Sequence, residues 1–181
     1  MPPEPKVTVR VAELSDVDQI RDLIVVSARA LSRDYYKSEQ IEAAIAHVFG
    51  VDTTLIADAT YFVAEEKGEL VGCGGWSKRR TLFGGDQYAA RDPGLADPAR
   101  DAARIRAFFV HPKLARQGVG RTLLTRCEDE ARAAGYKSAE LMSTLPGVSF
   151  YETNGYLPRP RTTFTVGEDV EIEFVPMRKV F

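Results

Sequence analysis

The segment Arg116-Gln117-Gly118-Val119-Gly120-Arg121 combines two glycines with two arginines, residue types suited to a phosphate-binding turn. A mostly apolar run at 105–110 precedes it and an amphipathic pattern at 118–134 follows, so a strand, a turn and a helix are predicted in that order. At such a junction free backbone N–H groups and the positive end of the helix dipole converge. Glycines let the backbone approach phosphate oxygens closely because no Cβ intervenes. The segment therefore predicts a phosphate or pyrophosphate site.

Two familiar nucleotide motifs do not fit this turn. A P-loop needs four residues between its glycines and then Lys followed by Ser or Thr. A dinucleotide fingerprint needs a third glycine at the position of Leu123. The spacing alone leaves a second interpretation open, in which a helix simply begins with glycines.

Two other stretches give the turn a context. The run Phe109-Val110-His111-Pro112 leads into it, and Phe150-Tyr151-Glu152-Thr153-Asn154-Gly155-Tyr156 follows later in the chain. With 115–124, the first resembles the acetyl-CoA motif of the GNAT superfamily of N-acetyltransferases, and the last resembles that family's Phe-Tyr-x-x-x-Gly-Phe/Tyr segment. The closing Pro176-Met177-Arg178-Lys179 is similar to the end of many members.

The resemblance implies that acetyl-CoA is the acetyl donor. Pantetheine would lie along the end of a strand as an added strand, on the backbone of Phe108, Phe109 and Val110. Thr144 stands where many members place a cofactor-contacting Asn, and Ala115 replaces a usual Gln or Arg. The pyrophosphate would be held by backbone N–H groups of the turn, which fall on Arg116, Gln117, Gly118, Val119, Gly120 and Arg121.

The chemistry requires an acid and a base. Tyr151 matches the tyrosine that in many members protonates or hydrogen-bonds the leaving thiolate, and a core tyrosine is the alternative. An alkyl ammonium with a pKa near ~10.4 must lose a proton before it attacks. Many members carry a Glu in the strand before the turn, whereas 103–110 holds no carboxylate. The base is therefore left open among Glu65, Glu66, Asp101, His111 and Glu140.

The leading functional hypothesis is an acetyl-CoA-dependent N-acetyltransferase acting on a primary amine of a small molecule. A protein N-terminus or lysine is an alternative acceptor, and a noncatalytic acyl-CoA sensor is an alternative of another class. The acceptor pocket is expected between helices at 17–33 and 38–49 and a loop at 81–102. Charged side chains in and beside that loop are candidates for substrate selection: Arg79, Arg80, Asp86, Asp97 and Asp101.

Hydrophobic periodicity predicts the elements that must position these residues. Strands are predicted at 7–11, 61–65, 70–76, 105–110, 139–142, 162–166 and 170–177, and helices at 17–33, 38–49, 118–134 and from Pro146 to Asn154. Gly72, Gly74 and Gly75 indicate a bulge, a close approach by a ligand or backbone, or a flexible strand end beneath Trp76. The order of strand, two helices, three strands, helix, strand, helix and two strands matches the family. The fold class is α/β with a mixed sheet, a GNAT-like acyl-CoA N-acyltransferase fold.

Composition sets the remaining expectations. The chain has 181 residues and a net charge of −2, which predicts one domain at 6–181 behind a flexible lead-in at 1–5, and no nucleic-acid partner. No apolar stretch approaches the ~20 residues of a membrane span, and no signal peptide is recognised, so a cytoplasmic protein is expected. Cys73 and Cys127 are interpreted as reduced core thiols, and no metal site is predicted. Oligomeric state is left open, with a homodimer as one option.

Overall fold

The computed structural model describes residues 6–181; the predicted lead-in at 1–5 lies outside them. The strands are β1 (Thr8–Val11), β2 (Tyr61–Glu66), β3 (Glu69–Ser77), β4 (Ala103–Val110), β5 (Ser138–Thr144), β6 (Leu157–Pro158), β7 (Thr162–Val166) and β8 (Val170–Val180). The α-helices are α1 (Val17–Ser32), α2 (Ser38–His47), α3 (Thr53–Ala57), α4 (Val119–Ala133) and α5 (Val148–Thr153). Short 3-10 turns occupy Leu14–Asp16, Pro112–Leu114 and Leu145–Gly147.

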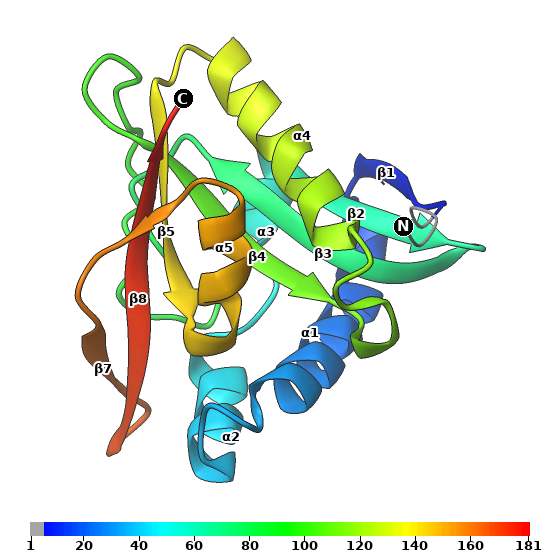
Figure 1. Ribbon diagram of the computed structural model, residues 1–181, viewed down its shortest axis with the longest axis vertical. Helices are drawn as coiled ribbons and strands as arrows, with labels where there is room; N and C mark the ends of the chain where they lie inside the picture. The colour runs from blue at the N-terminus through cyan, green and yellow to red at the C-terminus, as the bar shows by residue number, and fades with distance from the viewer. Residues whose placement is uncertain (1–5) are drawn as a thin grey trace.

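The strands of this described part form a mixed sheet in the order β1-β2-β3-β4-β5-β8-β6, with β7 paired to β8. The β4–β5 pair is parallel and the others are antiparallel. Pairing between β4 and β5 is confined to Ala103 with Ala139 and Arg104 with Glu140. Beyond these two pairs the strands diverge, as Figure 1 shows, and α5 lies beside the opening. The sheet is thus split between β4 and β5.

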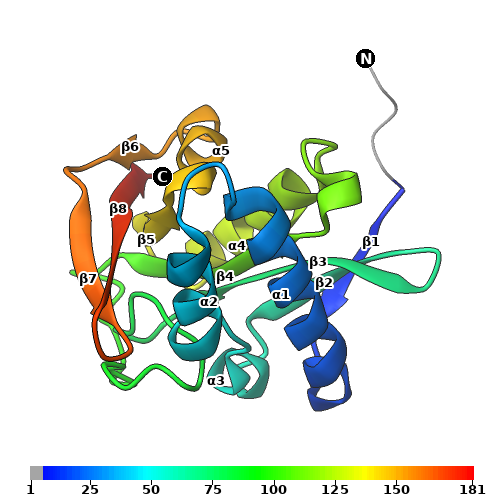
Figure 2. The same ribbon diagram turned by 90° about the horizontal axis from the view of Figure 1, so that it is seen from below.

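Helices cover both faces of the sheet because strand side chains alternate between them. On β2, Phe62 and Ala64 join the core under α4, whereas Tyr61 and Val63 join the core under α1 and α3. The helix α4 lies in front of the sheet in Figure 1, and α1 and α2 lie on the other side, facing the viewer in Figure 2. The opening between β4 and β5 therefore passes through the sheet, from the helices on one face to the helices on the other.

A bulge in β4 lies opposite the glycines of β3. Gly75 pairs with Arg106 and Cys73 pairs with Phe109, so Gly74 alone faces two residues of β4. One of those two, Ala107, has a φ of 53°, in the left-handed region that residues with a Cβ seldom adopt. A Cβ on Gly74 would lie 2.7 Å from the Phe108 ring. Of the alternatives that the glycines left open, the structure shows a bulge, with its extra residue in β4 rather than in the glycine strand. The space that Gly74 leaves is filled by the Phe108 ring.

Two elements were missing from the predicted order. The helix α3 is five residues long, too short to show a helical period, and begins where Asp52 Oδ1 accepts from the Thr54 N–H at 3.0 Å. The strand β6 is two residues long and pairs with β8 at Met177 and Arg178. The long loop was predicted correctly: 78–102 contains one isolated bridge, between Arg79 and Leu95.

The predicted core thiols are confirmed, since Cys73 and Cys127 are both free and both buried. Across residues 6–181, no helix has the length and apolar character needed to cross a membrane.

Candidate active site

A cavity of about 690 Å³ lies at the split in the sheet. The diverging strands line it through 105–110 of β4 and 141–144 of β5. The turn before α4 and the helix α5 line one half. The other half is lined by α1, the residues after α2, the segment Leu82–Gly85 and Phe174 of β8. The cavity therefore joins the predicted donor site to the predicted acceptor pocket.

The turn before α4 presents backbone N–H groups at the cavity. Arg116 and Gly118 have φ angles of 62° and 91°, and Gly118 is the N-cap of α4 without a side-chain cap. The helical hydrogen bonds begin with the Thr122 N–H donating to the Gly118 carbonyl at 3.0 Å. The N–H groups before Thr122 belong to the first turn, where a helix has no internal acceptor for them. This geometry suits an anion.

Of the six predicted residues of the turn, four line the cavity and two do not. Arg116, Gly118, Gly120 and Arg121 line the cavity, as do Ala115 before them and Thr144 of β5. The Gln117 side chain instead donates to the Lys113 carbonyl at 2.9 Å, and Val119 is 1% exposed and packs in the core. The Gln117 N–H also has an acceptor within the turn, the Leu114 carbonyl at 3.3 Å. For Val119, any contact with a ligand would have to come from the backbone.

The β4 strand offers a free edge along the cavity. Phe108, Phe109 and Val110 all line it, and β5 pairs with β4 only at Ala103 and Arg104. Backbone N–H and C=O groups on that side of 105–110 lack a neighbouring strand, which makes the edge a template for an extended polar ligand.

Tyr151 lies in α5 at the wall of the cavity and is 9% exposed. Its ring packs edge-on against Phe150, Tyr156 and Phe108, with centroids 4.9, 5.7 and 6.4 Å away. Burial, and to a lesser degree the nearby Cys127 thiol, raise the pKa of Tyr151 above the usual value for a phenol. The hydroxyl is therefore a neutral donor at physiological pH.

None of the five groups considered as a base lines the cavity. Glu65 accepts from Arg10 at 2.8 Å, Glu140 pairs with Arg104, and Asp101 accepts from the Asp97 N–H at 2.7 Å. His111 Nδ1 accepts from the Lys113 N–H at 3.2 Å, and Glu66 ends β2. Within residues 6–181, the cavity lining contains no Asp, Glu or His side chain.

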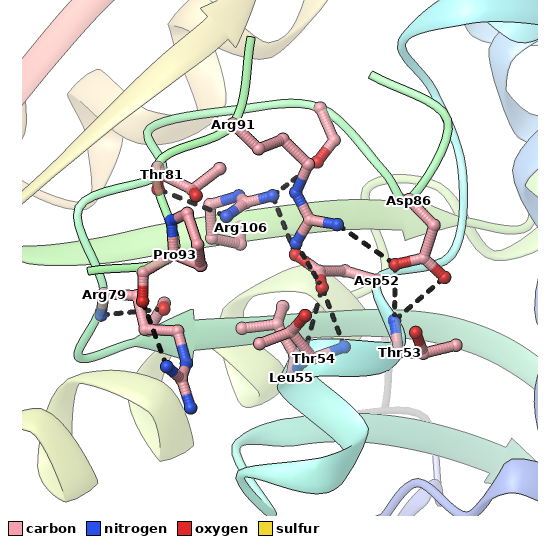
Figure 3. A network of polar contacts seen from close by, with 12 residues as sticks. Asp52, Thr53, Thr54, Leu55, Arg79, Thr81, Asp86, Arg91, Pro93 and Arg106 are labelled. Atoms are coloured by element: carbon pink, nitrogen blue, oxygen red, sulfur yellow. Dashed lines mark hydrogen bonds and ion pairs between the residues drawn. The ribbon is translucent and has the colours of Figure 1, made fainter. Parts of the chain in front are cut away.

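A buried ion pair beneath the cavity was missed by sequence reasoning. Arg106 of β4 donates through Nη2 to Asp52 Oδ2 at 2.8 Å, and these residues are 3% and 0% exposed (Figure 3). Arg106 also donates to the carbonyls of Thr81 at 3.1 Å and Gly84 at 2.5 Å. Burial lowers the pKa of Arg106 to about 10, which leaves the guanidinium charged near neutral pH. The sequence feature that could have revealed the ion pair is a charged residue, Arg106, inside the apolar run 105–110.

The same contacts fasten the long loop to the α2–β2 connection. Arg91 donates to Asp52 Oδ1 at 2.7 Å and to Asp86 at 3.1 Å, and Arg79 pairs with Asp58 at 2.7 Å (Figure 3 shows Arg79, Arg91 and Asp86). The loop charges that were candidates for substrate selection do not line the cavity. Each of them forms an ion pair or hydrogen bond with another residue of the chain. These residues are Arg79, Arg80, Asp86, Asp97 and Asp101.

Comparison with known proteins finds relatives among acetyltransferases. The model of the acetyltransferase (GNAT) family matches residues 19–156. An IAA acetyltransferase from Azospirillum brasilense is 28% identical over 144 residues, which cover 77% of this chain and 80% of that protein.

Solved structures share the fold. A GCN5-related N-acetyltransferase from Rhodopseudomonas palustris superposes with a TM-score of 0.71 at 21% identity, covering 96% of this chain and 95% of its own. The yncA protein of Salmonella typhimurium, solved with its cofactor acetyl-CoA, gives a TM-score of 0.63 at 18% identity, covering 97% and 94%. With a family model that matches most of its length and a sheet split at the predicted donor site, this chain belongs to the GNAT family of acetyltransferases.

Proposed function

We propose that the protein transfers an acetyl group from acetyl-CoA to a primary amine of a small molecule. The observation that carries the proposal is that one cavity is lined by both the anion-suited turn before α4 and the unpaired edge of β4. A pyrophosphate and a chain of amides are the two chemically distinct parts of CoA that such a pair of features suits.

The turn would hold the donor through its backbone. The N–H groups of Arg116 and of 118–121 would contact the pyrophosphate, whereas that of Gln117 donates to the Leu114 carbonyl. The positive charges of Arg116 and Arg121 at the cavity would strengthen that binding. The β4 edge at 108–110 would hydrogen-bond the amides of the pantetheine arm, which directs the thioester toward the middle of the cavity.

Tyr151 would act at the reacting sulfur. The amine nitrogen forms a bond to the thioester carbon and the carbon–sulfur bond breaks, so the nitrogen loses a proton and the sulfur gains one. A neutral phenol can donate the proton that the sulfur needs. The nitrogen's proton would leave through water, because the described cavity lining holds no carboxylate or imidazole.

A noncatalytic acyl-CoA sensor is the second candidate. The same lack of a carboxylate or imidazole in the described lining favours it, since a protein that only binds CoA needs no base.

A small-molecule acceptor is supported by the second half of the cavity, whose walls come from α1, the residues after α2, the long loop and β8.

Acetyl transfer and CoA binding should be measured separately on the same preparation. Incubation with acetyl-CoA and a panel of amines is expected to release thiol only when an accepted amine is present, with the acetylated amine identified by mass spectrometry. Calorimetry should detect CoA binding. Binding without turnover on any small or peptide amine would establish the sensor instead, and acetylation of peptides alone would overturn the small-molecule acceptor.

A further inference from the structure

The half of the cavity away from the turn is lined by aliphatic and small side chains together with a group of aromatic ones. We call it the acceptor half and define it by Tyr35, Phe49, Phe83, Phe109 and Phe174. These residues come from both ends of the α2 region, the long loop, β4 and β8, so segments distant in sequence supply one surface.

The four phenylalanine rings of the acceptor half pack against one another. The Phe49 centroid lies 5.7 Å from that of Phe109 and 6.3 Å from that of Phe174, both in edge-on geometry. Phe83 lies 5.7 Å from Phe174. A ligand ring beside such a group can add edge-on or offset contacts of the same kind, which a flexible aliphatic chain cannot make.

The charge around the cavity has one sign. Among the described residues that line it, those of the types Asp, Glu, Lys, Arg and His are Arg106, Arg116 and Arg121. Asp52 is fully buried and already accepts from Arg106 and Arg91, and it does not line the cavity. A second ammonium on the acceptor would lose water and find no counter-charge, which is strongly unfavourable.

The wall that carries Phe83 is held in place. The Arg106 guanidinium donates to the carbonyls on either side of Leu82 and Phe83, those of Thr81 and Gly84. Because Asp52 neutralises that guanidinium in the interior, the Leu82–Gly85 segment is fixed without any charge from the acceptor. The surface is therefore preorganised for an apolar group.

We infer that the acceptor is an aromatic monoamine, a primary amine on a flat apolar body without a second positive charge. The inference rests on the proposed acetyltransferase function. The inference excludes diamines and polyamines as acceptors, because recognition of their second ammonium group would require carboxylates along the acceptor half.

Four primary amines test the inference with the 181-residue chain. The ratio kcat/KM should be compared for 2-phenylethylamine, its ring-aminomethyl derivative, 2-cyclohexylethylamine and 1,4-diaminobutane. The first should exceed both diamines by on the order of 100-fold because an unpaired charge is so costly to bury, and should also exceed the cyclohexyl amine. Equal or greater activity with the diamines would overturn the inference and leave the acetyltransferase intact. Parity of the cyclohexyl amine would refute the aromatic requirement. No turnover with any of the four amines would overturn the aromatic monoamine, and the wider panel of small and peptide amines decides separately whether the protein is an acetyltransferase.

A pair of variants tests the charge directly. Phe83→Glu places a carboxylate on the acceptor wall, whereas Phe83→Gln has the same shape without the charge. The diamine-to-monoamine ratio of kcat/KM is expected to rise roughly tenfold or more in Phe83→Glu relative to Phe83→Gln. Calorimetric CoA binding equal to that of the original protein would show that both variants are folded. The same ratio in the two variants would show that wall charge does not select the acceptor.

Discussion

At the scale of single residues, the turn before α4 depends on backbone conformations that few residue types adopt. Gly118 has a φ of 91° and Arg116 a φ of 62°. An L-residue with a Cβ pays roughly 1 kcal/mol or more to sit there. Gly120 is crowded in a second way, because a Cβ on it would lie 3.2 Å from the Phe150 ring. Both glycines are thus constrained by the shape of the proposed donor site.

Gly118→Asp is expected to weaken CoA binding by on the order of 100-fold or more, because it adds a negative charge and a Cβ where the pyrophosphate would approach. Calorimetry measures the change. Gly68→Asp is the matched control: Gly68 also has a positive φ, of 84°, and a Cβ there would meet nothing within 4 Å. That control shares the backbone strain and should bind CoA normally. Equal losses in the two variants would assign the effect to strain.

Tyr151→Phe should lower kcat by roughly 100-fold, in the range of general acid catalysis, with little change in CoA affinity. Tyr88→Phe removes a phenol hydroxyl outside the cavity lining and should leave kcat as it was. Steady-state kinetics and calorimetry give the two quantities. A kcat that is unaffected by Tyr151→Phe would remove the tyrosine from the reaction.

The pH dependence follows from the direction of the Tyr151 shift. Burial raises the pKa of Tyr151, so the phenol keeps its proton beyond the pH of about 10 at which an ordinary tyrosine ionises. Its contribution to kcat is present below the raised pKa and lost above it. We therefore expect no fall in kcat from phenol ionisation between pH 7 and 10. An alkaline fall within that interval that Tyr151→Phe abolishes would contradict the assignment.

At the scale of elements, the periodic helices and strands could be predicted from sequence, whereas α3, β6 and the Arg106 pair could not. The helix α1 has a long apolar stripe, with Ile20, Leu23 and Ile24 buried. The five-residue α3 has no room for a stripe. Arg106 and Asp52 are joined only by the folding of β4 against the α2–α3 connection, a relation that no local pattern contains. The donor turn was visible because its residues are contiguous.

Asp52→Asn should destabilise the fold by about 3 to 5 kcal/mol, since it leaves the buried guanidinium of Arg106 without its counter-charge. It also weakens the attachment of Arg91. Asp18→Asn is the control, because the Asp18 pair with Arg21 is largely exposed and should contribute less than about 0.5 kcal/mol. Urea denaturation measures the free energy of unfolding of each variant. A loss in Asp52→Asn no larger than that of the control would mean that the buried pair does not support the loop.

At the scale of the whole molecule, the described sheet consists of two groups of strands, β1 to β4 and β5 to β8, that share two residue pairs. Each group has its own extensive antiparallel pairing. The cavity lies where the groups separate, so a ligand there contacts both. At a concentration 100 times its Kd, such a ligand stabilises a protein by about 2.7 kcal/mol.

The narrow junction between β4 and β5 also bears on how the molecule opens. Strands joined over so short a length can behave as separate cooperative units, each with its own free energy of opening. Amide hydrogen exchange should therefore show different protection for β2–β3 and for β5–β8 in the free protein. Acetyl-CoA should raise the protection of both groups of strands to a similar value and should add protection at the amides of 105–110. Uniform protection in the free protein would mean that the two groups of strands already open as one cooperative unit, held together by the helices. Acetyl-CoA would then not be needed to couple them.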